Sequence, residues 1–409
     1  MRFHVLHSPL GTLLAYHLRR TLPSKHAVSL IYNHRDVVQK QITPNNAVRL
    51  EHSGVIMSVP NIDFELHGRS RRSPSEGSSG TSTVVGTEAT PSESKPIESL
   101  IVAVPPSATR STLNSLIHRL SPQSTIVLMQ TGLGVYEELV TKLFPNPARR
   151  PHFIIGSPRH YAWLKYPNHV VHNLAGSIDF SIVPDPHGRD FEAILRSSDI
   201  SSLDRGLRLT DIANKDKDPQ FAEYASLRNT VAVLSRLDAL NVSWLPMGEG
   251  EIVFRRDLVV RAVTDALAVT LGMPNGELLS TDSSRKLAEA LIREISGAFR
   301  RQWYTELRSH LPEPDDRLPP MPLLPKGLGR KALMGDLVRH LLVTKEYNAP
   351  MLSDIQIGTP TQLRYGLGYL FGIGRTYGFP MPTTSALYRT IRARESIGRP
   401  ICKSLKERI

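Results

Sequence analysis

The amino-acid sequence predicts an α/β N-terminal domain built on a parallel sheet, followed by an all-α C-terminal domain. In the first half, apolar runs of strand length alternate with helical patterns, and such alternation implies parallel strands joined by right-handed crossovers. From about residue 219 onward, helical patterns dominate. The chain has 409 residues, enough for two ordinary domains. We place the boundary after residue 247, which gives domains of residues 1–247 and 248–409.

The chain opens with a βαβ unit. Residues 3–6 are a short apolar run, residues 11–20 carry leucines at helical spacing, and residues 27–32 form a second apolar run. Strand, helix and strand within ~30 residues predict two neighbouring parallel strands. Further units of the same kind follow. Their predicted strands are residues 100–104, 125–129, 153–155 and parts of 170–183, with helices at about 108–120 and 135–144.

Residues 68–96 interrupt this alternation. The segment is rich in Ser, Gly, Thr and Pro and contains no aromatic residue. Such a composition cannot bury enough apolar surface to offset the entropy lost on ordering. We therefore predict a disordered insertion within the first domain.

Helical patterns fill the rest of the chain. A proline-rich stretch at residues 312–325 separates two of them and is a predicted connection, because proline removes a helical hydrogen bond. The predicted helices are residues 221–238, 251–272, 283–310, 328–346 and 358–377.

The composition narrows the class of protein. Apolar residues make up 40% and charged residues 22%, as in ordinary globular proteins. No run of 18 apolar residues occurs, so we predict no membrane span. The single cysteine, Cys402, cannot form an internal disulfide or build a thiolate metal site, and no metal-binding motif is evident. We expect no metal.

The chain is strongly basic. Fifty Lys and Arg residues stand against 38 Asp and Glu residues, for a net charge of +12. Such a surplus favours nucleic acid, ribosomal or anionic membrane surroundings, although a basic enzyme would have the same balance. Residues 1–35 contain five Lys or Arg and no Asp or Glu, which is typical of mitochondrial targeting segments. We therefore expect a mitochondrial protein, of the matrix or the inner-membrane periphery, with the cytoplasm as the alternative.

Four segments carry a family resemblance. They are VLHSPLGTLLAYHLRR at residues 5–20, the stretch containing QTGLG at 100–139, FRRDLVVRAVTDALAVTLGMPNGELL at 254–279 and TPTQLRYGLGYLFGIGRTYGFPMPTTSAL at 359–387. Each resembles a segment of the ketopantoate reductase (2-dehydropantoate 2-reductase) family, in the same order. The resemblance implies a Rossmann-type domain and a helical domain of the 6-phosphogluconate-dehydrogenase type. It also implies reduction of 2-dehydropantoate to pantoate by NADPH, in a cleft between the domains.

The segment that resembles the family's phosphate-binding turn has lost most of its glycines. A Gly-x-Gly-x-x-Gly turn brings backbone N–H groups to a pyrophosphate. Here the turn is His7–Thr12, in which Gly11 would be the third glycine and Pro9 removes an N–H. A basic residue after the second strand would suit the 2′-phosphate of NADP. We expect no cofactor, or NADP(H) if any, and the candidate binding residues are Ser8, Gly11, Arg35 and Gln130.

The positions that resemble the family's catalytic residues carry other side chains. Asp257 replaces the lysine that acts as general acid, and a carboxylate cannot supply that proton near neutral pH. Arg261 and Asp265 replace asparagines of the same helix, and their spacing favours a structural ion-pair ladder. Thr131 replaces the asparagine of a glycine turn, and Gln362 replaces the glutamate that holds the substrate hydroxyl. We expect no catalytic residue to be retained.

Two hypotheses follow, from different classes. The first is a non-catalytic adaptor in mitochondrial gene expression that contacts a mitochondrial mRNA or the mitoribosome; in overall type this resembles the yeast activator of cytochrome b translation. The second is an NADPH-dependent reductase of 2-dehydropantoate or a related 2-oxo acid. The candidate RNA contacts are Arg19–Arg20, Arg69, Arg71, Arg72, Arg300–Arg301 and the tail from Arg392 to Arg408.

Overall fold

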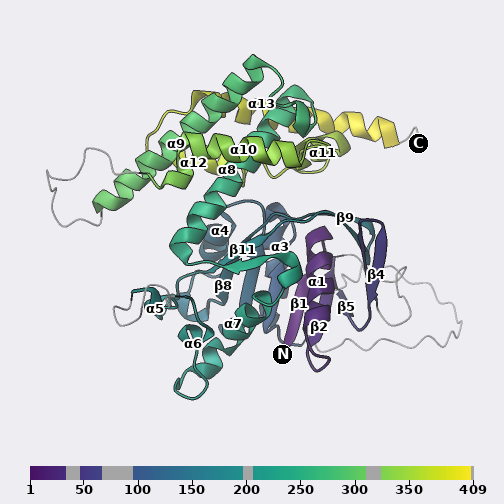
Figure 1. The fold of residues 1–409 in the computed structure, drawn as a ribbon, viewed down its shortest axis with the longest axis vertical. Helices are drawn as coiled ribbons and strands as arrows, with labels where there is room; N and C mark the ends of the chain where they lie inside the picture. The colour runs from purple at the N-terminus through teal and green to yellow at the C-terminus, as the bar shows by residue number, and fades with distance from the viewer. Residues whose placement is uncertain (34–46, 67–94, 197–205, 310–323, 407–409) are drawn as a thin grey trace, which may run out of the picture. The chain divides into compact units, whose positions relative to one another are not determined.

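The computed structural model describes residues 1–33, 47–66, 95–196, 206–309 and 324–406, with side chains placed as far as residue 397. The chain divides into two compact units (Figure 1). Unit 1 is Met1–Val104, Ala108–Met129 and Leu139–Trp244, and unit 2 is Pro105–Ser107, Gln130–Glu138 and Leu245–Ile409. The main division falls after Trp244, against a predicted boundary after residue 247. The predicted insertion and proline-rich connection lie, except at their ends, outside the described residues.

Unit 1 contains an eight-stranded sheet with the order β12-β11-β8-β7-β6-β1-β2-β5. Its strands are β1 (Arg2–Leu6), β2 (Ala27–Tyr32), β5 (Asp63–Leu66), β6 (Ser99–Val102), β7 (Thr125–Met129), β8 (His152–Pro158), β11 (Ile178–Ile182) and β12 (Val242–Trp244). Neighbours are parallel except for β11, which runs antiparallel to β8. The predicted parallel sheet is thus confirmed for most of its width. β12 is an addition, because helical patterns dominate the sequence around it.

The helices of the first half follow the predicted alternation. Strands β6 and β7 are buried along their whole length, which explains their unbroken apolar sequences. Helix α7 packs against both of these strands, and α1 packs beside β1 and β2. The helices are α1 (Pro9–Thr21), α3 (Pro106–Leu116), α4 (Val135–Lys142), α5 (Ala193–Arg196), α6 (Leu209–Ile212) and α7 (Phe221–Leu234).

A second sheet in unit 1 joins two segments that lie far apart in the sequence. Its order is β4-β3-β10-β9, from β3 (Val48–His52), β4 (Val55–Val59), β9 (Tyr161–Tyr166) and β10 (His169–Leu174). Strand β3 pairs in parallel with β10. This sheet also contacts α1 (Figure 1), so α1 is buried on every side from Gly11 to Leu18. Of these strands, the sequence pattern predicts only β10.

Unit 2 is all helical, with one apolar core. Its helices are α8 (Met247–Leu271), α9 (Asp282–Ser309), α10 (Arg330–Val343), α11 (Pro350–Ile357), α12 (Leu367–Thr376) and α13 (Pro382–Lys406). The predicted helix at residues 358–377 is wrong in its first half, because Gly358 ends α11 in the left-handed region at φ 72° and Pro360 follows. None of the described helices has both the length and the apolar character that crossing a membrane requires.

Candidate functional site

The turn between β1 and α1 is closed by the helix's own cap. Ser8 is the N-cap residue of α1, and its hydroxyl oxygen accepts a hydrogen bond from the Gly11 N–H at 2.9 Å. The Thr12 N–H donates to the Ser8 carbonyl at 2.8 Å, and Pro9 has no N–H to offer. Free N–H groups at a helix N-terminus are what binds an anion. Among the described residues of this turn, the N–H groups of Ser8 and Leu10 are the ones left for that purpose.

Gly11 lies where α1 comes closest to the end of β1. A Cβ atom at Gly11 would lie 2.1 Å from the carbonyl oxygen of Leu6, far inside van der Waals contact. This is the packing role of the third glycine in a dinucleotide-binding turn. The contact is consistent with our interpretation of Gly11 as the third glycine of such a turn. Ser8 also ties the turn to the segment that follows β6, since its hydroxyl donates to the Ala103 carbonyl at 3.0 Å.

His7 fills the bend itself. Its ring stacks on Tyr32 with the centroids 4.2 Å apart, and its Nε2 atom lies 2.7 Å from the carbonyl oxygen of Pro167 in the β9–β10 turn. Burial lowers the pKa of His7, so the ring is neutral near pH 7 and donates its Nε2 hydrogen to that carbonyl. A side-chain-free approach is what a pyrophosphate requires at such a bend. An imidazole held by two contacts does not allow it.

The other two candidates for cofactor binding add little. Arg35 lies outside the described residues. Gln130 follows β7 directly and is buried. The described part of the turn, with its proline, its imidazole and its capped amide, therefore does not fit the pyrophosphate of a dinucleotide.

The positions that resemble the family's catalytic helix lie on α8. Burial and the charge of Arg261 lower the pKa of His340 on α10 to about 4, and Asp257 opposes that shift. Burial raises the pKa of Asp265 to about 7, while a hydrogen bond from the Met351 N–H at 3.2 Å and the charge of Arg261 act in the other direction. The described hydrogen bond of Asp265 thus caps the start of α11. The ion-pair ladder stays a prediction, supported by the influence of Arg261 on Asp265.

Thr131 is exposed in a turn that docks on the segment around Tyr365, within unit 2. A Cβ atom at Gly132 would lie 2.8 Å from the Cβ of Tyr365, and the Leu133 N–H donates to the Tyr365 carbonyl at 3.1 Å. The Tyr365 hydroxyl donates to Glu138 at 2.7 Å. Only the fold reveals this contact, because the two partners are 227 residues apart.

Gln362 lies beside this contact. Its side-chain oxygen is buried and has no hydrogen-bond donor among the described residues. A buried acceptor without a donor costs free energy, about 1–3 kcal/mol. The amide oxygen is therefore able to accept a hydrogen bond from a ligand hydroxyl, although it lacks the charge of the glutamate that it replaces.

The arginines predicted to contact RNA differ in their exposure and in their hydrogen bonds within the protein. The guanidinium of Arg19 donates to the carbonyl oxygens of His26, Leu22 and Pro23 at 2.6–2.8 Å, so it stabilises the end of α1. An RNA contact at Arg19 stays a prediction. Arg20 is exposed in unit 1, and the arginine pair of α9 is exposed in unit 2. Arg69, Arg71, Arg72 and the side chains beyond residue 397 lie outside the described residues.

Four histidines gather around α1 and the second sheet: His17, His52, His160 and His172. The Nδ1 atom of His160 lies 3.1 Å from Nε2 of His172. Burial, followed by neighbouring positive charges, lowers the pKa of His17 and of His172 to about 4. In the part of the chain that the structure describes, no three His, Cys, Asp or Glu side chains are arranged to hold a metal ion. Burial also lowers the pKa of His160, so His17, His160 and His172 are neutral packing groups near pH 7.

Comparison with known proteins extends these observations. The family model "Ketopantoate reductase PanE/ApbA" matches residues 10–185, and "Ketopantoate reductase PanE/ApbA C terminal" matches residues 255–395. A curated relative, the "Probable 2-dehydropantoate 2-reductase" of Schizosaccharomyces pombe, is 25% identical over 206 residues, which is 50% of each chain. The chain thus spans about half the length of this relative.

Solved structures share the fold across nearly the whole chain. The PanE/ApbA family ketopantoate reductase of Ralstonia eutropha has a TM-score of 0.64 at 14% identity, over 98% of this chain and 100% of that one. A D-mandelate dehydrogenase with NADH and anilino(oxo)acetate has a TM-score of 0.64 at 15% identity, over 97% and 99%. The probable 2-dehydropantoate 2-reductase of Bacillus subtilis has a TM-score of 0.59 at 17% identity, over 96% and 100%. At such identities the likeness concerns the fold. Together the two family models cover more than half of the sequence, and the chain belongs to the ketopantoate reductase family.

Proposed function

We propose that this protein is a non-catalytic member of the ketopantoate reductase family that works as an adaptor in mitochondrial gene expression. The observation that carries the proposal is the closed β1–α1 turn, in which the Ser8 hydroxyl occupies the Gly11 N–H and the ring of His7 fills the bend. Tight binding of a dinucleotide would require that cap to open and that ring to move. A reductase without its hydride donor has no reaction.

The second half of the site supports the same proposal. Asp257 takes the place of the acid that would protonate the substrate alkoxide, and Asp265 is engaged in capping α11. Turns and packing glycines persist around them, for example at Gly132. A fold that keeps its packing contacts and loses its reacting groups is suited to a binding role, since function resides in sites rather than in folds.

The proposed partner is a mitochondrial mRNA or the mitoribosome. A net charge of +12 favours a polyanion through counterion release. The exposed guanidinium groups of Arg20, Arg300 and Arg301 are the described contacts that we propose. The location that we propose is the mitochondrial matrix or the periphery of the inner membrane, on the strength of the acid-free residues 1–35.

Two measurements test the adaptor proposal. Thermal-shift and fluorescence titration of the full chain with NADPH should show no saturable binding at concentrations that saturate an active reductase. Gradient sedimentation of mitochondrial extract at physiological salt should place the protein with ribosomal particles, and ribonuclease or high salt should release it. Free sedimentation at low mass under physiological salt would sink the adaptor idea.

A second candidate is an NADPH-dependent reductase of a 2-oxo acid, favoured by the unsatisfied oxygen of Gln362 and by the relative named a probable 2-dehydropantoate 2-reductase. It predicts NADPH oxidation that depends on added 2-dehydropantoate. Gln362→Ala should then lower kcat/KM about 2- to 13-fold, because a neutral hydrogen bond is worth ~0.5–1.5 kcal/mol. Gln356→Ala, at an exposed position of α11, is the matched control. The absence of any oxidation with the intact protein would eliminate this candidate.

A further inference from the structure

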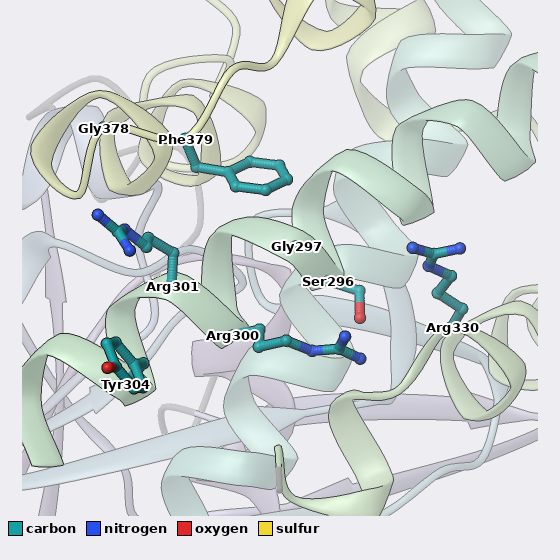
Figure 2. A pocket seen from close by; sticks show the side chains of 8 residues that line it. All are labelled: Ser296, Gly297, Arg300, Arg301, Tyr304, Arg330, Gly378 and Phe379. Atoms are coloured by element: carbon teal, nitrogen blue, oxygen red, sulfur yellow. The ribbon is translucent and has the colours of Figure 1, made fainter. Parts of the chain in front are cut away.

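A basic pocket lies within unit 2, apart from every position considered above except the α9 arginine pair. Its volume is about 530 Å³. The walls come from the middle of α9, from the first residue of α10 and from the turn between α12 and α13 (Figure 2). The lining residues are Ser296, Gly297, Arg300, Arg301, Tyr304, Arg330, Gly378 and Phe379.

The described lining of this pocket is basic. Three of the described lining residues are arginines, and none of the described ones is an acid. In Figure 2 the side chains of Arg300 and Arg330 lie on either side of Ser296, whereas Arg301 extends toward the Gly378 turn. One guanidinium N–H of Arg301 donates to the Tyr377 carbonyl at 3.4 Å, which leaves the charge of this group in place. A surplus of positive charge along the wall of a cavity favours the binding of an anion.

The N-terminus of α10 adds to this positive potential. Arg330 is the first residue of this 14-residue helix, and its N-cap, Gly329, has no side chain to accept the first N–H groups. No acidic residue stands in the first turn. The N-terminal end of a helix carries about half a positive charge, and uncapped N–H groups there bind anions. The dipole of α10 therefore adds to the positive charge that the Arg330 guanidinium brings to the pocket.

Two aromatic side chains also line the pocket: Phe379 from the turn between α12 and α13, and Tyr304 from α9. The ring of Phe379 rests on Gly297: a Cβ atom at Gly297 would lie 2.2 Å from the Phe379 Cζ atom. A glycine on α9 thus makes the room that the ring occupies, and Tyr304 lines the pocket one turn beyond Arg300. Aromatic faces beside arginines are the combination that proteins use for bases carrying phosphates. Arginine binds phosphate oxygens in pairs, which lysine cannot do.

We infer that this pocket binds the phosphate groups of a nucleotide, with the base against the Phe379 and Tyr304 side. The volume falls in the range of small-ligand sites, and a concave cavity suits a free nucleotide better than an RNA strand. The inference goes beyond the proposed adaptor function, but it shares Arg300 and Arg301 with the proposed RNA contacts. The oligoribonucleotide arm of the test separates the two uses of these arginines. An enzyme and an adaptor would both be able to carry such a site.

Calorimetric titration of the full chain with ADP tests the inference. ADP should bind with a 1:1 stoichiometry, inorganic pyrophosphate should compete with it, and adenosine should bind at least ~10-fold more weakly, because charge-assisted hydrogen bonds supply most of the affinity. Arg300→Gln and Arg330→Gln should each weaken ADP binding ~10-fold or more. Arg293→Gln removes the same charge from an exposed position of α9 that does not line the pocket, and should leave binding within about twofold.

Three results would overturn the inference. They are no ADP binding, ADP binding that the two pocket variants leave intact, and adenosine binding as tightly as ADP. A short oligoribonucleotide without terminal phosphates provides the remaining arm. If it binds more tightly than ADP and ADP does not displace it, the site belongs to RNA and the free-nucleotide inference fails. Thermal melting of each variant checks that it remains folded.

Discussion

The backbone N–H of Gly11 donates a hydrogen bond to the hydroxyl of Ser8, 2.9 Å away. This contact caps α1 and at the same time removes a donor that a pyrophosphate would use. The same hydrogen bond therefore stabilises the helix and lowers the number of N–H groups that are free to bind an anion. Asp265 is similar, because its carboxylate accepts the Met351 N–H and so caps the start of α11.

The capping role of Ser8 predicts that Ser8→Ala lowers the stability of the folded protein. The substitution removes the acceptor of the Gly11 N–H and the donor to the Ala103 carbonyl, so we expect a loss of ~1–2 kcal/mol in the free energy of unfolding. Urea denaturation followed by circular dichroism measures it. Ser58→Ala, on the exposed strand β4, should stay within ~0.5 kcal/mol of the parent. Equal effects of the two substitutions would refute the structural role of Ser8.

Gly11→Ala should be far more harmful than an ordinary helix substitution. The new Cβ atom would lie 2.1 Å from the Leu6 carbonyl oxygen, so α1 must move away from β1. We expect a loss of more than ~3 kcal/mol, or insoluble protein. Gly335→Ala is the matched control, because the nearest atom to its new Cβ is 3.7 Å away on α10. That change should instead stabilise the protein by up to ~1 kcal/mol, and thermal melting should separate the two variants in opposite directions.

The histidine cluster predicts a loss of stability in mild acid. The folded-state pKa of His17 and of His172 is about 4, against 6.5 as the ordinary value. Between these values the unfolded chain binds more protons than the folded one, so stability falls as the pH drops from 6.5 toward 4. The double variant His17→Gln, His172→Gln should flatten the dependence of the unfolding free energy on pH in this window. An unchanged slope would contradict the prediction.

The raised pKa of Asp265 predicts the opposite dependence of stability on pH. Its folded-state pKa, about 7, lies above the ordinary 3.8, so its contribution to stability is complete below pH 3.8 and is lost as the pH rises through 7. Asp265→Asn keeps an oxygen for the Met351 N–H and removes the ionisation. We expect the variant to be more stable than the parent at pH 8, by roughly 1–2 kcal/mol, with the difference vanishing near pH 4.

The control for this change is Asp216→Asn, at an exposed carboxylate. Chemical denaturation at both pH values should show no comparable gain for it. If Asp265→Asn is equally or less stable than the parent at pH 8, the carboxylate is ionised and well paired in the folded protein, and the prediction fails.

Much of the fold was open to prediction from local patterns. The apolar runs at β2 and β7 coincide with the strands at residues 27–32 and 125–129, because a buried parallel strand needs an unbroken apolar sequence. The second sheet was missed because its β3 and β4 are short and partly exposed, and because β3 finds its partner β10 more than 100 residues further along the chain. A pairing over that distance leaves no local periodicity to read.

The site divides in the same way. The sequence alone establishes which side chains stand at Asp257, Thr131 and Gln362, and hence which reactive groups these positions offer. The fold decided what the replacements do: the Ser8 hydroxyl takes an amide, Arg19 turns back onto its own helix end, and α9, α10 and the Phe379 turn converge on a basic pocket. Residue identity fixes which groups can react, whereas hydrogen-bond partners and cavities depend on segments that only packing brings together.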